Sequence, residues 1–592
     1  MNKILLYLIM CLPLLAIGQN DQLAQNYFDK GEFEKALISY QDLLKLQPSQ
    51  SLFFQRVVES YQQLEQLDNA EKAINERLDK YKQAALLVDL GYNYHLRKDE
   101  AKANKYYDQA LDRIRKNPSE VYGVAAAFER KALVEKALQS YKIATEEDPR
   151  LSFNYQVAQL YGQAGDTDMM ISTFLDEAVK NPNSSIMIQN QLSRFMSEEG
   201  ETTFNDALRK ALLTRAQKDQ DIFWNHFLSW YFVQRKEYGK AFIQEKAIYK
   251  REPETFSNIV NLAQLAIEEN DDETAAEILG FVLENTQDLD VLVQSQYFLT
   301  QMRVNKAAAK DYAALETHLK ALLEQFGISP YTLSLQILQA HFVTFNLNRP
   351  EEGRTILRAA MELPLNKYQM ADVKMELADI LLFEEKFNQA LIYYSQIEED
   401  LKNDAIGHEA SLKAAKTSYF KSDFLYAQSQ FKVLKSASSQ LIANDALEYF
   451  LLINDNTVAD STQTALKKFA RADYLLYQKN SQEALTQFQA ILKEFKGDEI
   501  EAVTLLRLGK IYKQLGDYNT ALNHFQQIID KHAEAIYVDE ALYFSAEIYN
   551  TNLKDVEKAK ALYEKILFGH EDSIYFIDAR KKFRQLRGDA NL

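Results

Sequence analysis

Small residues recur along this chain at a nearly constant spacing. Ala36, Ala70, Ala103 and Ala137 are 34, 33 and 34 residues apart. A unit of this length holds two helices of about three to four turns each. The small residue marks the place where the backbones of neighbouring helices approach too closely for a larger side chain. The spacing therefore predicts an all-α chain, built as a tandem array of helical hairpins.

Aromatic residues, glycines and prolines keep the same register. Tyr or Phe follows the small residue by four positions, as at Tyr40 and Phe525, and so lies on the same helix face. Gly31, Gly165 and Gly516 fall between the two helices of a hairpin, where a residue that tolerates positive φ ends the first helix. Proline cannot donate the helical hydrogen bond and so closes the unit. Four of the 9 prolines stand 12 residues after the alanine, or after Met170 in its place: Pro48, Pro149, Pro182 and Pro253.

This frame resembles the tetratricopeptide repeat. The residues that carry the resemblance are Tyr27, Gly31, Phe33, Ala36, Tyr40, Leu43 and Pro48, and again Leu508, Gly509, Tyr512, Gly516, Tyr518, Ala521, Phe525 and Ile528. The resemblance implies a right-handed α-solenoid of helical hairpins whose surface holds other proteins. It does not name the protein that is held.

The period lengthens in the second half of the chain. Alanines at 390, 427, 484, 521 and 559 are 37, 57, 37 and 38 residues apart, and the long gap leaves room for an extra helix at about 445–453. Pro330, Pro350 and Pro364 interrupt the pattern between the halves, so we expect two arms joined by an irregular helical middle. The expected segments are a signal peptide at 1–18, an N-terminal array at 19–183, degenerate hairpins at 184–289, a bend region at 290–370, a C-terminal array at 371–572 and a basic capping helix and tail at 573–592.

The first 18 residues are expected to be a signal peptide. Lys3 precedes an apolar run from Ile4 to Ile17, and small residues near Gly18 suit a signal peptidase. No later stretch approaches the roughly 18 consecutive apolar residues of a membrane-spanning helix. Cys11 is the only cysteine, so the mature chain is expected to contain no disulfide.

The charge of the chain disfavours two classes of partner. Without Lys3, 67 basic residues face 85 acidic ones, a formal charge of −18. Nucleic acids and anionic membranes are bound by basic surface. We therefore expect protein partners, and the simplest interpretation of the acidity is solubility.

No catalytic, cofactor or metal pattern stands out. His524 and His532 are eight residues apart, two turns on one helix, which is too far to share a metal without further ligands. The chain has no nucleophile elbow and no phosphate-binding glycine-rich loop. The acidic run at 268–273 is expected to be a loop between helices. We therefore expect no enzyme activity, no cofactor and no metal.

The resemblance to the tetratricopeptide repeat also implies a binding groove, lined by the first helix of each hairpin. Aromatic residues interleaved with amides suit an extended peptide, although the same residues are also ordinary for half-exposed helix faces. The family variant that clamps a peptide carboxylate uses Lys, Asn and Arg at fixed groove positions. It is disfavoured here, because Asp21, Gln25 and Gln55 stand where some of those residues would be. In the N-terminal array the groove positions are Gln25, Phe28, Asp29, Gln55, Glu59, Gln62, Tyr92, His95, Tyr122, Arg130, Tyr155 and Gln159.

The last helix is unusually basic for this chain, with Arg580, Lys581, Lys582, Arg584 and Arg587. Basic residues favour a helix C-terminus, so the simplest role is a cap on the array, and the alternative is docking on an acidic partner or on lipid phosphates. Five apolar residues are expected to cover the open end of the stack: Ile574, Phe576, Ile577, Phe583 and Leu586. The segment 573–589 resembles the ending of exported tetratricopeptide proteins of Bacteroidetes-type bacteria, which implies the periplasm.

Together these features predict a non-catalytic periplasmic scaffold or adaptor that binds proteins through its concave helical surface. The alternative is a structural subunit of a cell-envelope machine, for outer-membrane assembly, secretion or cell-wall remodelling, held by its flanks. An association with the outer membrane, peripheral and through such a complex, remains open at this point.

Overall fold

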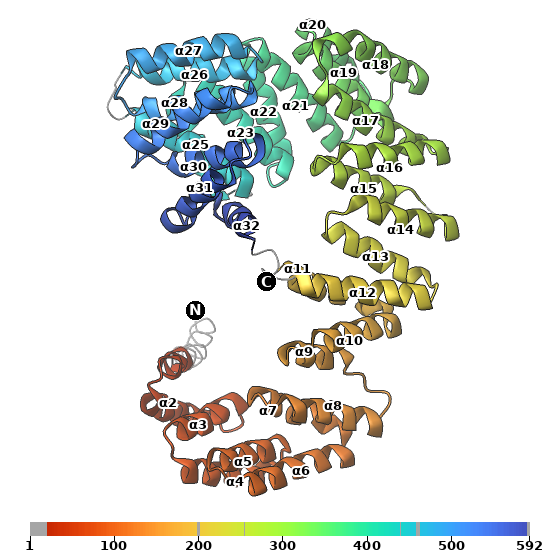
Figure 1. Ribbon diagram of the computed structural model, residues 1–592, viewed down its shortest axis with the longest axis vertical. Helices are drawn as coiled ribbons and strands as arrows, with labels where there is room; N and C mark the ends of the chain where they lie inside the picture. The colour runs from red at the N-terminus through yellow and green to blue at the C-terminus, as the bar shows by residue number, and fades with distance from the viewer. Residues whose placement is uncertain (1–19, 198–201, 254, 438–439, 458–461, 589–592) are drawn as a thin grey trace, which may run out of the picture. The chain divides into compact units, whose positions relative to one another are not determined.

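The computed structural model describes residues 20–197, 202–253, 255–437, 440–457 and 462–588 (Figure 1). The expected signal peptide and Cys11 lie outside these ranges. Every regular element within them is helical, and none is a strand. Consecutive helices pair as antiparallel hairpins, so the predicted all-α repeat architecture is confirmed.

Residue contacts divide the chain into two compact units, 1–215 and 216–592. Each is described by itself, and the expected segments within them stay predictions. The first unit begins with helical residues 20–29 and continues with α2 (Phe33–Leu46), α3 (Ser51–Gln63), α4 (Leu67–Tyr81), α5 (Ala85–Leu96), α6 (Glu100–Lys116), η1 (Pro118–Glu120), α7 (Val121–Arg130), α8 (Val134–Glu147), α9 (Asn154–Gln163), α10 (Thr167–Lys180), η2 (Pro182–Ser184) and α11 (Ser185–Ser197); α12 (Thr202–Lys218) crosses the boundary.

The second unit continues the helical hairpins and includes the additional helix α25. Its elements are α13 (Ile222–Gln234), α14 (Tyr238–Arg251), α15 (Ser257–Glu268), α16 (Asp272–Asn285), α17 (Leu289–Lys306), η3 (Ala309–Asp311), α18 (Tyr312–Phe326), η4 (Pro330–Thr332), α19 (Leu333–Phe345), α20 (Pro350–Met361), α21 (Lys367–Phe383), α22 (Phe387–Asp400), α23 (Ala405–Phe420), α24 (Phe424–Ala437), α25 (Gln440–Thr457), α26 (Thr464–Tyr477), α27 (Ser481–Glu494), α28 (Ile500–Gln514), α29 (Tyr518–Lys531), α30 (Val538–Glu547), the π-helical turn η5 (Ile548–Asn552), α31 (Val556–Gly569) and α32 (Phe576–Arg587).

The small residues of the repeat lie where close packing requires them. All of the predicted alanines are completely buried in the second helix of their hairpins, and Met170 is 2% exposed. The first helix approaches just as closely in places, since a Cβ atom at Gly91 would overlap the ring of Tyr107. The backbones of α5 and α6 therefore pack at a distance that only glycine allows at this position.

The turns between paired helices follow the sequence pattern. Gly31, Gly165 and Gly516 have φ values of +75°, +78° and +79°, so the prediction of left-handed turn residues is confirmed. The acidic run at 268–273 spans the turn between α15 and α16, with residues 269–271 between the two helices and the rest at their ends. There the carboxylate of Asp271 accepts a hydrogen bond from the backbone N–H of Thr274, 3.3 Å away, and caps α16.

The predicted extra helix is α25, and it changes the path of the array. It packs against α24 in place of a normal hairpin partner, so α26 returns to the end of α21. The Tyr474 hydroxyl donates to the Leu382 carbonyl oxygen at 2.6 Å, and the Tyr477 hydroxyl to that of Asp379 at 2.8 Å. The Gln478 side-chain amide donates to the carbonyl oxygen of Phe383, also at 2.8 Å.

The last helix, α32, packs against α31 and supports the predicted cap only in part. Phe583 is buried, and Leu586 packs at the edge of the same core. The expectation for Ile574 and Ile577 is wrong, because these side chains are 66% and 73% exposed. Ile574 lies in the turn before α32, and Ile577 lies on a different face of the helix from the buried Ala579 and Phe583.

Candidate functional site

Two hollows lie on the first helices of the N-terminal hairpins. The larger, of about 730 Å³, is lined by residues of the first helix, α3, α5 and α7, and the smaller, of about 540 Å³, by residues of α3 to α7. Arg130 lines both hollows. The predicted groove residues at their walls are Phe28, Gln55, Glu59, Gln62, Tyr92 and Arg130.

Several of these side chains already hold one another in place. The carboxylate of Glu59 accepts hydrogen bonds from Gln55 at 2.8 Å and from Arg56 at 2.9 Å, and lies 3.6 Å from the ammonium of Lys131. That ammonium also lies 4.9 Å from the ring centre of Tyr92. The wall at Glu59 and Tyr92 is therefore a fixed surface of charges and rings.

The other predicted groove residues do not line these hollows. His95 contacts Glu100 at 2.6 Å, and Tyr122 packs edge-on against Phe153 with ring centres 5.5 Å apart. Gln159 donates to the hydroxyl of Tyr155 at 3.4 Å. Gln25 bonds to Asp29 and accepts from Tyr40. The residue-by-residue groove assignment stays a prediction, and the geometry brings only its α3, α5 and α7 part together.

The sequence interpretation missed Asp89, which lines the smaller hollow. Its side chain is only 7% exposed, and within the described residues it makes no hydrogen bond or ion pair. Burial raises the pKa of this carboxyl, although Lys131 and Arg130 oppose the shift. A single carboxylate in the apolar run 84–91 was the signal that could have found it. Arg130, exposed on the other side of the same hollow, has no ion pair within the described residues either.

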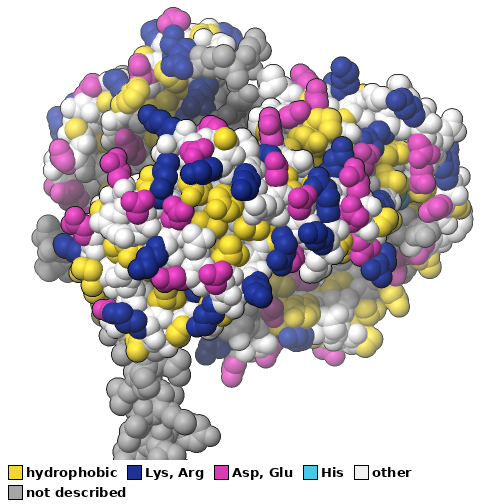
Figure 2. Space-filling model, turned by 90° about the horizontal axis from the view of Figure 1, so that it is seen from below, with side chains coloured by type: hydrophobic (Ala, Val, Ile, Leu, Met, Phe, Trp, Pro, Cys, Tyr) yellow, Lys and Arg dark blue, Asp and Glu magenta, His cyan; other side chains and the backbone are white. Residues whose placement is uncertain are grey.

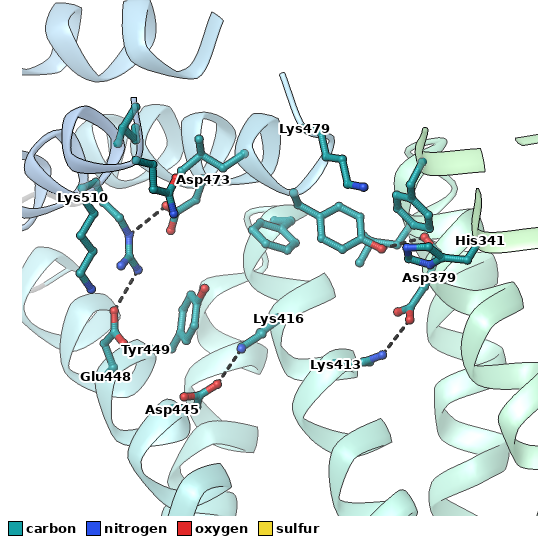
Figure 3. Close-up of a pocket in the computed structure, with 18 residues that line it drawn as sticks. His341, Asp379, Lys413, Lys416, Asp445, Glu448, Tyr449, Asp473, Lys479 and Lys510 are labelled. Carbon is teal, nitrogen blue, oxygen red and sulfur yellow. Dashed lines mark hydrogen bonds and ion pairs between the residues drawn. The ribbon is translucent and has the colours of Figure 1, made fainter. Parts of the chain in front are cut away.

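The second unit contains a cavity of about 670 Å³, which the sequence did not predict (Figure 3). Its walls come from α19, α21, α23, α25, α26 and α28. On each helix the lining residues are spaced three or four apart and so share one face, as do Arg507, Lys510, Ile511 and Gln514 on α28. The return of α26 to α21 closes one side of this cavity.

Ion pairs from different helices line the cavity (Figure 3). Lys413 lies 2.7 Å from Asp379, and Lys416 lies 2.9 Å from Asp445. Arg507 bridges two acids from separate helices, Asp473 at 3.2 Å and Glu448 at 2.9 Å. Burial raises the pKa of Asp473. At Glu448 burial also acts to raise the pKa, but the charges of Arg507, Lys510 and Lys416 and the hydrogen bond from Arg507 together outweigh it and lower the pKa.

Lys479 follows α26 and is the exception among the cations at the cavity. Within the described residues its ammonium has no carboxylate partner, and its contact is with the ring of Phe345, 5.8 Å from the ring centre. Partial burial lowers its pKa. In Figure 3 the side chain points toward the side of the cavity that holds His341.

Several of the basic residues of α32 make contacts within the protein. The ammonium of Lys582 lies 2.8 Å from both Glu547 and Asp578, and these contacts raise its pKa despite burial. Arg580 and Arg587 lie against the rings of Phe576 and Phe583. Lys582 thus anchors α32, while a role for Lys581 and Arg584 in binding stays a prediction.

The surface and the histidines give no sign of other chemistry in the described ranges. His524 stacks on Tyr512 with ring centres 5.5 Å apart, His532 lies 3.8 Å from Glu501, and no group of described residues is arranged to hold a metal. None of the described helices is long and apolar enough to cross a membrane. On the face drawn in Figure 2, basic and acidic side chains are interspersed.

Comparisons with known proteins identify the repeat. Two family profiles, both described as tetratricopeptide repeat, match residues 20–50 and 504–535. No curated protein sequence matches the chain. Among solved structures, one of Naa15/Naa10 bound to HypK-THB is similar, with 12% identity, 97% of each chain covered and a TM-score of 0.29. The APC/C hetero-tetramer Cut9-Hcn1 also matches at 12% identity, with 97% of this chain and 98% of that chain covered and a TM-score of 0.24.

The paired helices of the described residues define the class of protein as an all-α solenoid of helical hairpins. One segment that matches the tetratricopeptide repeat lies in each unit, residues 20–50 in the first and 504–535 in the second. Proteins built from this repeat generally bind other proteins.

Proposed function

We propose that this protein is a non-catalytic scaffold that binds an extended segment of another protein along α3, α5 and α7. The observation that carries the proposal is that Asp89 and Arg130 both line the smaller hollow, and that neither forms a side-chain hydrogen bond or ion pair within the described residues. The charges of Lys131 and Arg130 act on the Asp89 carboxylate without bonding to it, so its oxygens are able to accept hydrogen bonds from a ligand.

An extended backbone offers both of the groups that these side chains lack. Its N–H groups donate to a carboxylate, and its carbonyl oxygens accept from a guanidinium. Phe28 and Tyr92, at the larger hollow, add rings that cover apolar side chains of the segment. Because the helices are already packed, little ordering entropy is lost on binding.

The proposal includes a location, the periplasm. It rests on Lys3 and the apolar run that follows it, together with the resemblance of segment 573–589 to exported proteins. Cell fractionation combined with N-terminal sequencing of the mature chain tests it. A chain that keeps Met1 and stays in the cytoplasm contradicts the location without affecting the binding site.

The binding site is tested with a peptide selected from a random library on the immobilised full-length chain. Arg130→Gln is expected to weaken the affinity roughly tenfold, the effect of one lost charge-assisted hydrogen bond. Arg150→Gln is the matched control, because Arg150 pairs only with Asp148, in the loop before α9. Equal affinities of the wild type and Arg130→Gln would contradict the proposed site. If the chain purified from native cells is found only in a large membrane complex, and if it selects no peptide, the envelope-subunit alternative is favoured.

A further inference from the structure

One wall of the cavity in the second unit comes from α26, a helix that contacts a distant part of the array. The hydrogen bonds from Tyr474, Tyr477 and Gln478 to the end of α21 join helices that a regular array would keep apart. Its volume, about 670 Å³, falls within the range of small-molecule sites. A hollow of this size can hold a small organic molecule.

Each carboxylate of the cavity already contacts a protein cation. Asp379 and Asp445 each hold a lysine, and Asp473 and Glu448 share Arg507. A cationic ligand would therefore have to displace a protein cation. Lys510 is also engaged, because its ammonium lies 2.5 Å from Glu540.

Lys479 is left with an unmatched positive charge beside apolar walls. The rings of Phe345 and Phe420 lie 6.1 and 6.0 Å from that of Tyr477. Leu382, Leu476 and Ile511 complete the apolar lining. His341 does not offer a second group for the anion, because its ring stacks on Phe345 and its Nδ1 lies 3.0 Å from Glu376.

We propose that this cavity binds a small organic anion, a carboxylate or phosphate monoester on a flat apolar body, with the anionic group on Lys479 and the body against Phe345 and Tyr477. The anion supplies the charge that Lys479 lacks, and the rings remove the apolar body from water. The site is independent of the N-terminal hollows, which lie in the other unit.

Calorimetric titration of the full-length chain tests the proposal with three probes: 2-naphthoate, 2-naphthyl phosphate and the neutral 2-naphthalenemethanol. We expect saturable binding of at least one anion, and at least roughly tenfold weaker binding of the alcohol. Comparison of the two anions distinguishes a carboxylate from a phosphate ligand. Absence of saturable binding of both anions to the wild-type chain would overturn the proposal.

Two substitutions locate the binding. Lys479→Met is expected to weaken the anion roughly tenfold and to leave the alcohol unchanged. Lys554→Met is the matched control, because Lys554 is likewise an exposed turn lysine with positive φ, 55° against 59° for Lys479, but lies outside the cavity.

Leu476→Trp, checked for folding by circular dichroism, is expected to abolish binding of anion and alcohol alike by filling the cavity. An equal loss in both lysine variants, or none in Lys479→Met, contradicts the site. Binding of a glutamate-containing hexapeptide through Lys479, with none of the naphthyl anions, would replace the small ligand by a protein segment.

Discussion

The hydroxyl of Tyr474 donates a hydrogen bond to the backbone carbonyl of Leu382, 2.6 Å away and 92 residues earlier in the chain. In a regular array each hairpin contacts only its neighbours. Here α25 occupies the place of a hairpin, and the following helix reaches back to the end of α21. This contact positions the wall that carries Asp473 and Tyr477 in the cavity.

Tyr474→Phe removes this contact and leaves the ring. We expect the free energy of unfolding of the second unit to fall by about 1 kcal/mol, because a buried hydrogen bond is lost without a change in volume. Hydrogen–deuterium exchange of α21 and α26 in the full-length chain measures the effect locally. Tyr426→Phe, at an exposed tyrosine on α24, is the control and is expected to change nothing. Unchanged exchange in Tyr474→Phe would show that the return contact does not stabilise the wall.

Arg507→Met leaves Asp473 and Glu448 without their shared cation. At neutral pH we expect a loss of about 3–5 kcal/mol, the usual cost of breaking a buried ion pair from one side. Without the guanidinium the folded-state pKa of both carboxyls rises above the unfolded-state value. Folding then takes up protons, so the stability of the variant rises relative to wild type as the pH falls through those raised pKa values. Urea unfolding from pH 7 down to pH 5 measures the difference. The prediction is contradicted if the stability difference between Arg507→Met and wild type becomes larger as the pH falls.

Gly91→Ala tests the close approach of α5 and α6. The added Cβ atom must displace the ring of Tyr107, so we expect a loss of about 1–3 kcal/mol. Gly280→Ala is the matched control, since Gly280 lies within α16 with no atom within 4 Å of its Cβ position. There alanine is expected to be neutral or to stabilise by up to about 1 kcal/mol. Thermal unfolding of both variants compares them, and equal midpoints would mean that the packing distance is not fixed by Gly91.

The fold was predictable because its determinants are local. The interval from Ala36 to Ala70, the aromatic residue at 40 and the glycine at 31 each act within one hairpin, and stacking repeats the result. The same locality located α25, since a 57-residue gap must hold one more helix. The local pattern did not show that Phe583 is buried and Ile577 exposed. Which face of the last helix is covered depends on its contacts with α31.

The sites were less predictable because they depend on contacts between repeats. Asp473 and Arg507 are 34 residues apart and look like two ordinary helix positions until the array brings them together. Nothing near Tyr474 indicates that its partner is Leu382. At the N-terminal hollows, the family frame found Tyr92 and Arg130 but passed over Asp89, whose buried charge the frame does not describe.

Asp89→Asn is expected to stabilise the first unit at neutral pH. Burial raises the pKa of Asp89 in the folded state, so folding takes up protons between the unfolded value, about 3.9, and the raised one. Stability therefore falls as the pH rises through this window, and the neutral amide avoids that cost, on the order of 1 kcal/mol. Below both pKa values the two proteins are expected to be equally stable. Denaturant unfolding at pH 7 and pH 3 measures the gain, and a less stable Asp89→Asn at pH 7 would show that the carboxylate has a partner in the fold.

The affinity of Asp89→Asn for the selected peptide, measured by fluorescence polarisation at pH 7 beside the wild type, tests the central claim most directly. The variant is expected to bind roughly tenfold more weakly, because the charge that receives the backbone N–H is gone, although its fold is no less stable. Binding that is as tight as that of the wild type would contradict the account.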